Sequence, residues 1–538
     1  MKQIKFFATA LLMLFFAVSV VAQTHKVSSR WENPTNENLQ GANIYLGLLY
    51  EDDKSCYLLT EAKNGRGEYN YQIVECNKKS LKTTTKRIWN NERPITNLYY
   101  FGGEAYALMI ENPTRSLKEP ALYALRKLDK SSMAFEAKPI LALTGFETIV
   151  FSPDSSKMLL VAKSDNKEWE EIQFHLCVFD SKPNRLWDKE ITSPFTHVLP
   201  LIGGEATFPQ PLSFAVDNSG NAYISGRVYP NTIKKKDSEK EKDYYFSLLK
   251  ISPDGESKEL KLAANNLFLN KAAVNIDKDN RLLITGFYSD KANLKKAGAC
   301  YFYINKDFSQ IENLNTIEIP LEHQTLYLAT TRKKQSIKKE VERRFEDWNY
   351  TDVLYDGQGN MYLCAERKEI WEAGGSSSAI GPSVMSAIYY AYDTYILKVT
   401  PDKNLAWTKR IPKAQIYITE GITDGSNRIG HRVMLSSSGN IVVLFLDSPT
   451  NFKVKDDAKV QETSTRTSGR KADLVYVELD QNGNATKQIV ANSQEAKMYA
   501  VLKTACLLND NSLLLIARKD KSITSNSEKC KLGVITVK

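Results

Sequence analysis

The chain has 538 residues, of which 42% are hydrophobic, 25% charged and 10% aromatic, with 26 Gly and 18 Pro. This composition is typical of a globular protein and excludes a disordered chain, a collagen and a disulfide-dominated miniprotein. The formal net charge of +9 comes from 72 Lys and Arg against 63 Asp and Glu. It is small for this length, so we expect no nucleic-acid partner.

Residues 1–22 have the pattern of a secretory signal peptide. Lys2 and Lys5 precede an apolar run over residues 6–21, and small residues stand before Gln23, where a signal peptidase would cut. A run of about 16 apolar residues is shorter than the ~20 that a membrane-spanning helix needs. We therefore expect a mature chain, residues 23–538, that is exported to the periplasm or secreted and has no membrane span.

Seven cysteines leave at least one thiol unpaired within the chain. Cys56 and Cys76 are a candidate disulfide, because they flank a predicted hairpin with a Gly-rich turn and would face each other across its strands. Cys177, Cys300 and Cys364 lie in apolar strand patterns, where buried free thiols are expected. The sequence contains no Cys-x-x-Cys, so neither a zinc site nor a thioredoxin-like site is expected.

An internal repeat runs through the chain. Each copy is a short apolar strand, a four-residue turn rich in Asp, Ser, Gly and Asn, and a second apolar strand. Clear copies begin at residues 149, 213, 273, 352, 432 and 504, and weaker ones near 45 and 99. A third strand and a more polar fourth strand follow in most copies. Four antiparallel strands that recur every ~50–80 residues are typical of the blades of a β-propeller.

Two features of the repeats resemble known propellers. Residues 216–226 are similar to NHL-type and SBBP-type repeats, and the Trp-bearing fourth strands at 185–191 and 405–411 resemble those of quinoprotein-like propellers. The resemblance covers most of the mature chain. It implies an all-β fold with a single propeller. It implies no particular function, because the shared motifs are the residues that form the tight turns between strands.

The first strands of the repeats number eight, which predicts eight blades, or seven if one weak early copy is not a blade. The last repeat stops after its third strand, whereas residues 25–32 precede the first repeat and carry an Arg-Trp pair like that of the fourth strands. We therefore expect residues about 26–32 to pair with residues about 532–537 and to close the ring.

Long insertions gather in one class of connection. In a propeller, the connections between second and third strands, and between one blade and the next, lie on the same face, which we call the loop face. The insertions at 229–243, 321–349, 369–393 and 448–473 belong to this class. Because long loops on a rigid scaffold often carry binding sites, we expect the loop face to be the working surface.

Two of these insertions carry the candidate binding residues. Residues 332–344 predict a short amphipathic helix with a basic side, which is either a binding element or a solvated helix packed on the ring. Residues 371–392 are rich in Gly and Ser and then apolar and aromatic, which suits either a tongue that binds a partner or a plug over the central channel. The candidate binding residues are Arg332, Lys333, Lys334, Trp371, Tyr389, Tyr390 and Tyr392.

The sequence gives little support to catalysis. It contains no Gly-x-Ser-x-Gly nucleophile motif and no phosphate-binding loop. His197, His323 and His431 lie in loop-face connections and are the histidines that could converge on a metal near the axis.

Three aspartates, Asp217, Asp356 and Asp480, stand in Asp-x-x-Gly-Asn turns that superficially resemble calcium loops. They lack the full ligand spacing, and Asx turns explain them without a metal.

We therefore expect an exported, non-catalytic β-propeller that needs no cofactor or metal and binds a protein, a peptide or a glycan through its loop face. The alternative is a propeller hydrolase or lyase with its site in the axial channel. Carboxylates or histidines at the mouth of the channel would favour the enzyme, and an aromatic or apolar patch on the loop face would favour the binding protein.

Overall fold

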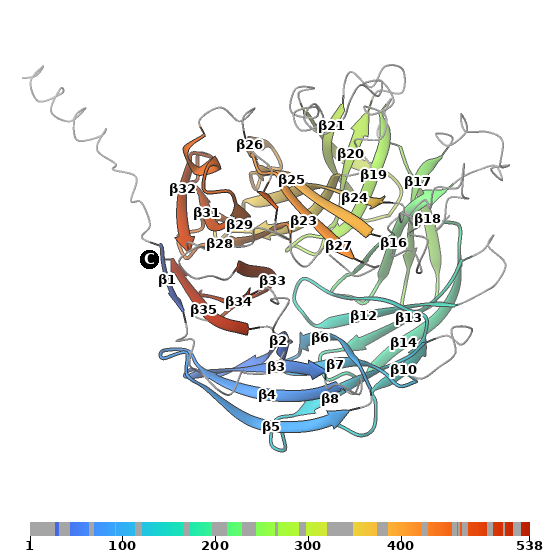
Figure 1. Ribbon diagram of the computed structural model, residues 1–538. Coiled ribbons are helices and arrows are strands. Elements are labelled where there is room, and N and C mark those ends of the chain that lie inside the picture. The colour runs from blue at the N-terminus through green and yellow to red at the C-terminus, as the bar shows by residue number, and fades with distance from the viewer. Residues whose placement is uncertain are drawn as a thin grey trace, which may run out of the picture.

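The computed structural model places eight antiparallel sheets in a ring, which is a β-propeller of eight blades (Figure 1). The described residues are 27–31, 43–63, 69–91, 93–112, 121–164, 172–195, 212–228, 244–263, 267–289, 297–319, 348–373, 386–420, 429–454, 460, 463–464, 472–491, 499–508, 512–519 and 529–537. In this part of the chain the elements are strands, apart from one 3-10 turn, η4 (Asn451–Lys453).

The strands of each blade are given in order from the innermost strand to the outermost. Blade 1 holds β2 (Asn43–Glu51), β3 (Ser55–Lys63), β4 (Tyr69–Asn77) and β5 (Thr83–Asn91). Blade 2 holds β6 (Ile95–Phe101), β7 (Glu104–Ile110), β8 (Leu122–Asp129) and a divided outer strand, β9 (Ala134–Phe135) and β10 (Leu141–Thr144). Blade 3 holds β11 (Phe146–Phe151), β12 (Lys157–Ser164), β13 (Ile172–Asp180) and β14 (Arg185–Ser193). Blade 4 holds β15 (Ser213–Val216), β16 (Ala222–Val228), β17 (Tyr245–Ile251) and β18 (Ser257–Leu262).

The other blades follow the same order, with additions in blade 6. Blade 5 holds β19 (Phe268–Ile276), β20 (Leu282–Ser289), β21 (Ala297–Ile304) and β22 (Ile311–Glu318). Blade 6 holds β23 (Trp348–Tyr355), β24 (Met361–Ala373), β25 (Ser386–Val399) and β26 (Leu405–Ile411), with β27 (Gln415–Glu420) and β30 (Thr463–Ser464) added. Blade 7 holds β28 (His431–Leu435), β29 (Ile441–Asp447), β31 (Asp473–Leu479) and β32 (Ala485–Ala491). Blade 8 holds β33 (Tyr499–Leu507), β34 (Leu513–Lys519), β35 (Lys529–Val537) and β1 (Val27–Trp31).

The repeated turn explains why each blade folds locally. In blade 4, Asp217 Oδ1 accepts the backbone N–H groups of Ser219 and Asn221 at 2.9 and 2.8 Å, and Asp217 Oδ2 accepts from Asn221 Nδ2 at 2.6 Å. Asp356 and Asp480 hold their own turns in the same way. These carboxylates are thus satisfied by Asx turns, as predicted, and each turn fixes the register of its hairpin.

The hydrophobic core lies between the blades and runs around the ring. Separate clusters of buried side chains join blades 1 and 2, 2 and 3, 3 and 4, 4 and 5, and 5 and 6, and one larger cluster joins blades 6, 7 and 8. A further cluster packs Leu58 and Val74 of blade 1 against Leu514 and Leu532 of blade 8. The ring is therefore closed by packing as well as by strand pairing.

Tryptophans on two outer strands lock a blade to its neighbour. Trp187 Nε1 of β14 donates to the carbonyl of Gly220 in blade 4 at 2.9 Å, and Trp407 Nε1 of β26 donates to the carbonyl of Gln481 in blade 7 at 3.0 Å. The aromatic outer strands noticed in the sequence thus serve contacts between blades.

The expected closure of the ring is confirmed. β1 pairs antiparallel with β35, from Val27 opposite Val537 to Trp31 opposite Gly533, and lies beside it in Figure 1. The hydroxyl of Ser29 also donates to the carbonyl of Val490 in blade 7 at 2.7 Å. The first described strand is therefore the outer strand of the last blade.

One of the expected insertions, residues 369–393, is described at both of its ends. β24 continues to Ala373 and β25 begins at Ser386, so these ends are paired strands that lengthen blade 6. Residues 229–243 and most of 321–349, with the predicted helix at 332–344, lie outside the described residues. In 448–473 the described elements are η4 and β30.

No helix among the described residues is long and apolar enough to cross a bilayer. The candidate signal peptide, residues 1–22, lies outside them.

Candidate functional site

Blade 6 carries an extension on the loop face, and a buried ionic cluster lies where the extension leaves the blade. β25 pairs with β26 over Thr394–Val399 and with β27 over Ser386–Ala391, so its outer partner changes along its length. β30 adds to β27 in parallel. We define the blade 6 extension as residues 368–373, 386–391, 415–420 and 463–464.

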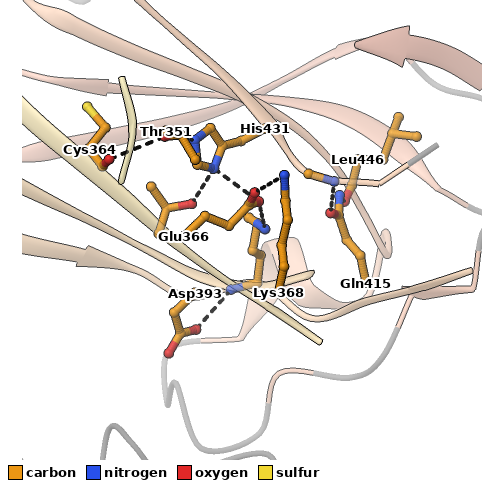
Figure 2. Close-up of polar contacts among 11 residues, drawn as sticks. Thr351, Cys364, Glu366, Lys368, Asp393, Gln415, His431 and Leu446 are labelled. Carbon is orange, nitrogen blue, oxygen red and sulfur yellow. Dashed lines mark hydrogen bonds and ion pairs between the residues drawn. The ribbon is translucent and has the colours of Figure 1, made fainter. Parts of the chain in front are cut away.

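Glu366 is the centre of the ionic cluster, and its side chain has no exposed surface. Its Oε1 lies 2.6 Å from Lys413 Nζ, which is equally buried, and 3.1 Å from His431 Nδ1 of blade 7. Its Oε2 lies 2.7 Å from Nζ of Lys368, a side chain that is 37% exposed. Figure 2 shows Glu366 between His431 and Lys368. One carboxylate therefore meets cationic or imidazole groups from both blades.

His431 joins the inner strands of blades 6 and 7. Its Nε2 lies 2.9 Å from the hydroxyl of Thr351 on β23, and its Nδ1 lies 2.8 Å from the hydroxyl of Thr394 on β25. The side chain of His431 is 1% exposed, whereas Thr351 is exposed. The imidazole is thus held at both nitrogens, with one hydroxyl partner open to solvent.

Further polar contacts fix the chain where β25 changes partner. Asp393 Oδ2 accepts from Arg410 Nε at 2.7 Å, and both side chains are almost fully buried. Gln415 accepts the backbone N–H of Gly430 at 2.7 Å and donates to the carbonyl of Leu446 in blade 7 at 2.8 Å (Figure 2). The first residue of β27 is therefore tied to the neighbouring blade.

The charges of the cluster shift its pKa values. Burial alone would raise the pKa of Glu366, but His431, Lys413 and Lys368 outweigh it and hold this pKa well below the usual value. Burial lowers the pKa of Lys413, against the attraction of Glu366. Glu366 is accordingly ionised at neutral pH, and it supplies the negative charge that the buried ammonium requires.

Aromatic side chains gather on the blade 6 extension. Tyr389 lies directly opposite Tyr417 on β27, and both are half-buried. The rings of Tyr390 and Tyr392 stack with centroids 5.7 Å apart, and the guanidinium of Arg367 lies 5.1 Å from the centre of the Tyr392 ring. Strand alternation places Tyr389 and Tyr417 on the face opposite Tyr390.

The structure brings together some of the residues proposed from the sequence. Tyr389 and Tyr390 are half-buried on the extension, and Tyr392 is 3% exposed at its base, where it packs on Ala414. The backbone of Trp371 lies in β24 opposite Ile388, and its side chain is outside the described part of the chain.

Other candidates are placed elsewhere. Arg332, Lys333 and Lys334 lie outside the described residues, as do His197 and His323. Cys56 and Cys76 are direct partners across β3 and β4, as expected from the hairpin, and both side chains are buried. Their disulfide stays a prediction.

Glu366, Lys413 and Thr394 were not singled out by the sequence analysis. A signal was present in Glu366-Arg-Lys368, because three charges in succession directly after the buried residues Met361–Ala365 are unusual for the second strand of a blade. His431 was noticed as a loop-face histidine, but its partners come from distant segments.

Comparison with known proteins finds no matching family model and no matching curated protein. Among solved structures, the chain is similar to the β-propeller domain of the Trilobed protease from Pyrococcus furiosus, at 12% identity and a TM-score of 0.36, over 83% of this chain and 97% of that one. A prolyl endopeptidase matches at 11% identity and a TM-score of 0.32, over 75% of this chain and 54% of its own.

A variant of the Synechocystis apocarotenoid oxygenase matches at 11% identity and a TM-score of 0.31, over 96% of this chain and 97% of its own. We draw nothing about function from these similarities. The assignment of the propeller fold comes from the strand pairing described above.

Proposed function

We propose that this protein is an exported, non-catalytic β-propeller that binds a protein, a peptide or a glycan in the cell envelope through the blade 6 extension on its loop face. The observation that carries the proposal is the extension itself. β24 and β25 have 13 and 14 residues, whereas the second and third strands of the other blades have 7 to 9.

A blade does not need these additional residues, because blades 3, 4 and 5 are complete with four strands of ordinary length. The extension is nevertheless anchored through Glu366, Lys413 and Gln415. Burial of the charged groups of Glu366 and Lys413 costs free energy, because both lose their hydration. A rigid, anchored element that presents half-buried tyrosines is suited to recognition, since tyrosine supplies large contact area with little loss of conformational freedom.

The test uses the mature chain, residues 23–538, and a variant that carries Tyr389→Ala and Tyr417→Ala on one face of the extension. Immobilised protein is exposed to envelope extract and, separately, to a glycan array, and each retained molecule is identified and its Kd measured with purified material. We expect the double variant to lose at least tenfold in affinity.

Tyr100→Ala is the matched control, because Tyr100 is 58% exposed and lies in blade 2 beside the turn between the first and second strands, away from the loop face. Equal affinity of the double variant and the wild type for the identified partner would contradict the proposal. Export is tested separately by fractionating the producing cells and sequencing the N-terminus of the protein, which we expect to begin at Gln23.

A second candidate function, a hydrolase at the channel, is favoured by one arrangement. The exposed hydroxyl of Thr351, the imidazole of His431 and the carboxylate of Glu366 follow one another at 2.9 and 3.1 Å. This is the order of a nucleophile, a general base and an orienting acid. Hydrolysis of an activated aryl ester that is abolished by Thr351→Val and retained in the Tyr389/Tyr417 variant would select this function instead.

A further inference from the structure

A patch on the outer part of blade 3 gathers four side chains that bind transition metals. β13 and β14 pair with His175 opposite Glu190 and Cys177 opposite Asp188. Direct partners of an antiparallel pair share a face, and residues two apart on one strand do so as well. The register therefore places these four residues at the corners of a small square on a single face of the sheet.

Three of these side chains already converge. His175 Nε2 lies 3.5 Å from Cys177 Sγ and 3.9 Å from Asp188 Oδ2, and the three ligand atoms all lie within 4.8 Å of one another. A tetrahedral zinc ion, with Zn–N of ~2.0–2.1 Å and Zn–S of ~2.3 Å, sets its nitrogen and sulfur ligands ~3.5–3.6 Å apart. The His–Cys separation is thus the one that zinc requires, whereas the carboxylate oxygen of Asp188 has to move closer to both of the other ligand atoms.

The surroundings allow entry and a fourth ligand. Cys177 is fully buried, whereas His175 and Asp188 are 30% and 42% exposed, so the group opens to solvent on its carboxylate side. Glu190 is exposed beside His175. Arg185 competes for the site, because its Nη1 lies 2.7 Å from the same Asp188 oxygen. This ion pair between exposed groups is weak enough to exchange for a metal bond.

We propose that His175, Cys177 and Asp188 form a binding site for a divalent transition cation, Zn²⁺, with Glu190 or water in the fourth position. Thiolate, imidazole and carboxylate together suit zinc among the divalent ions, whereas Mg²⁺ and Ca²⁺ prefer oxygen ligands alone. Binding replaces the S–H bond of Cys177 with a Zn–S bond, and the thiol proton passes to solvent. The site lies on blade 3, and the proposal does not depend on partner binding at blade 6.

The test is titration of the metal-stripped mature protein with Co²⁺ in the presence of a reductant, followed by displacement with Zn²⁺. A cobalt–thiolate site gives a charge-transfer absorption band in the near ultraviolet that oxygen and nitrogen ligands do not give. We expect one equivalent of Co²⁺ to produce this band, one equivalent of Zn²⁺ to abolish it, and Mg²⁺ to leave it unchanged.

Two variants assign the band to this site. Cys177→Ala should abolish it, and His175→Gln should weaken the affinity for Zn²⁺ at least tenfold, as measured by competition with a chromophoric chelator. Cys300→Ala is the matched control, because Cys300 is a fully buried thiol on the equivalent strand of blade 5, and this variant should keep the band.

Absence of the band in the wild type, or its persistence in a folded Cys177→Ala protein, would overturn the proposal. Folding of each variant is checked by far-ultraviolet circular dichroism. Because His175→Gln leaves the buried thiol in place, it tests the site even if Cys177→Ala disturbs the core between blades 2 and 3.

Discussion

Replacing Lys413 with methionine tests whether the buried ion pair anchors the blade 6 extension. The substitution keeps the length of the side chain and removes the ammonium that lies 2.6 Å from Glu366 Oε1, with neither side chain exposed to solvent. Removal of one partner of a buried ion pair leaves the other charge uncompensated and costs about 3–5 kcal/mol. His431 and Lys368 remain near Glu366, so we expect the lower part of this range.

The corresponding change in melting temperature follows from the length of the chain. At ~2.1 cal/mol/K per residue, the unfolding entropy of the mature chain, residues 23–538, is about 1.1 kcal/mol/K, so a loss of about 3 kcal/mol lowers the melting temperature by about 3 °C. Differential scanning calorimetry of the mature protein at pH 7 measures this shift. The same samples should show faster proteolysis near residues 415–420, because β27 begins two residues after Lys413.

Two controls separate the charge from the packing. Lys368→Met removes a cation that is equally close to Glu366 but 37% exposed, and it should cost no more than about 1 kcal/mol. The double variant Glu366→Met/Lys413→Met leaves neither charge of the pair buried, and it should be more stable than Lys413→Met alone. Equal melting temperatures for Lys413→Met and Lys368→Met would refute the reasoning.

Three further predictions concern pH, packing and redox state. Because the pKa of Glu366 is low in the folded state, its ionised form stabilises the fold above about pH 4.5, and this stabilisation is lost as the pH falls through the folded-state pKa. The loss of stability caused by Glu366→Gln, measured by urea unfolding, should therefore become smaller on acidification. A loss that is constant from pH 7 to pH 3 would contradict this. Gly298→Ala should lower the free energy of unfolding by on the order of 1–3 kcal/mol or more, as in an overpacked core, because a Cβ there would clash with a carbonyl of β22. A Cβ at Gly357 would meet open space, so Gly357→Ala should be neutral in the same thermal assay. In protein recovered from an oxidising compartment, Cys56 and Cys76 should form one cross-linked peptide that separates on reduction, and alkylation of both thiols without reductant would exclude the disulfide.

The propeller is readable from the sequence because its determinants are local. Each Asx turn, such as that of Asp217, is encoded within five residues, and the two strands that it joins lie directly before and after it in the sequence. The pairing of β1 with β35 was also predictable, since a last repeat with three strands and a leading segment of fourth-strand character leave one arrangement that removes both edges.

The strand pairing of the blade 6 extension was not predicted, although residues 371–392 were expected to be a tongue or a plug. Ile388-Tyr-Tyr-Ala-Tyr392 has the aromatic, β-favouring composition of a strand, but the Gly-Ser stretch at 374–378 is typical of a loop. The change of partner from β26 to β27 depends on contacts with blade 7, which periodicity within one segment does not reveal.

The two side-chain clusters depend on register between strands that the sequence does not specify. The spacing of His175 and Cys177 places them on one face of a strand, but Asp188 joins them only because β14 pairs at one register and not the next. Likewise, Glu366 and His431 meet across a boundary between two blades.

Closure of the ring by β1 makes blade 8 depend on two segments from opposite ends of the fold. β1 is synthesised before any blade exists, yet its partner β35 spans Lys529–Val537, so blade 8 stays incomplete until β35 has been synthesised. Until then the apolar surface of blade 1, including Leu58 and Val74, lacks its neighbour. Trimming β1 should therefore leave blade 8 with an open outer edge, whereas trimming β35 should in addition remove Leu532 and Val534 from the cluster that covers blade 1.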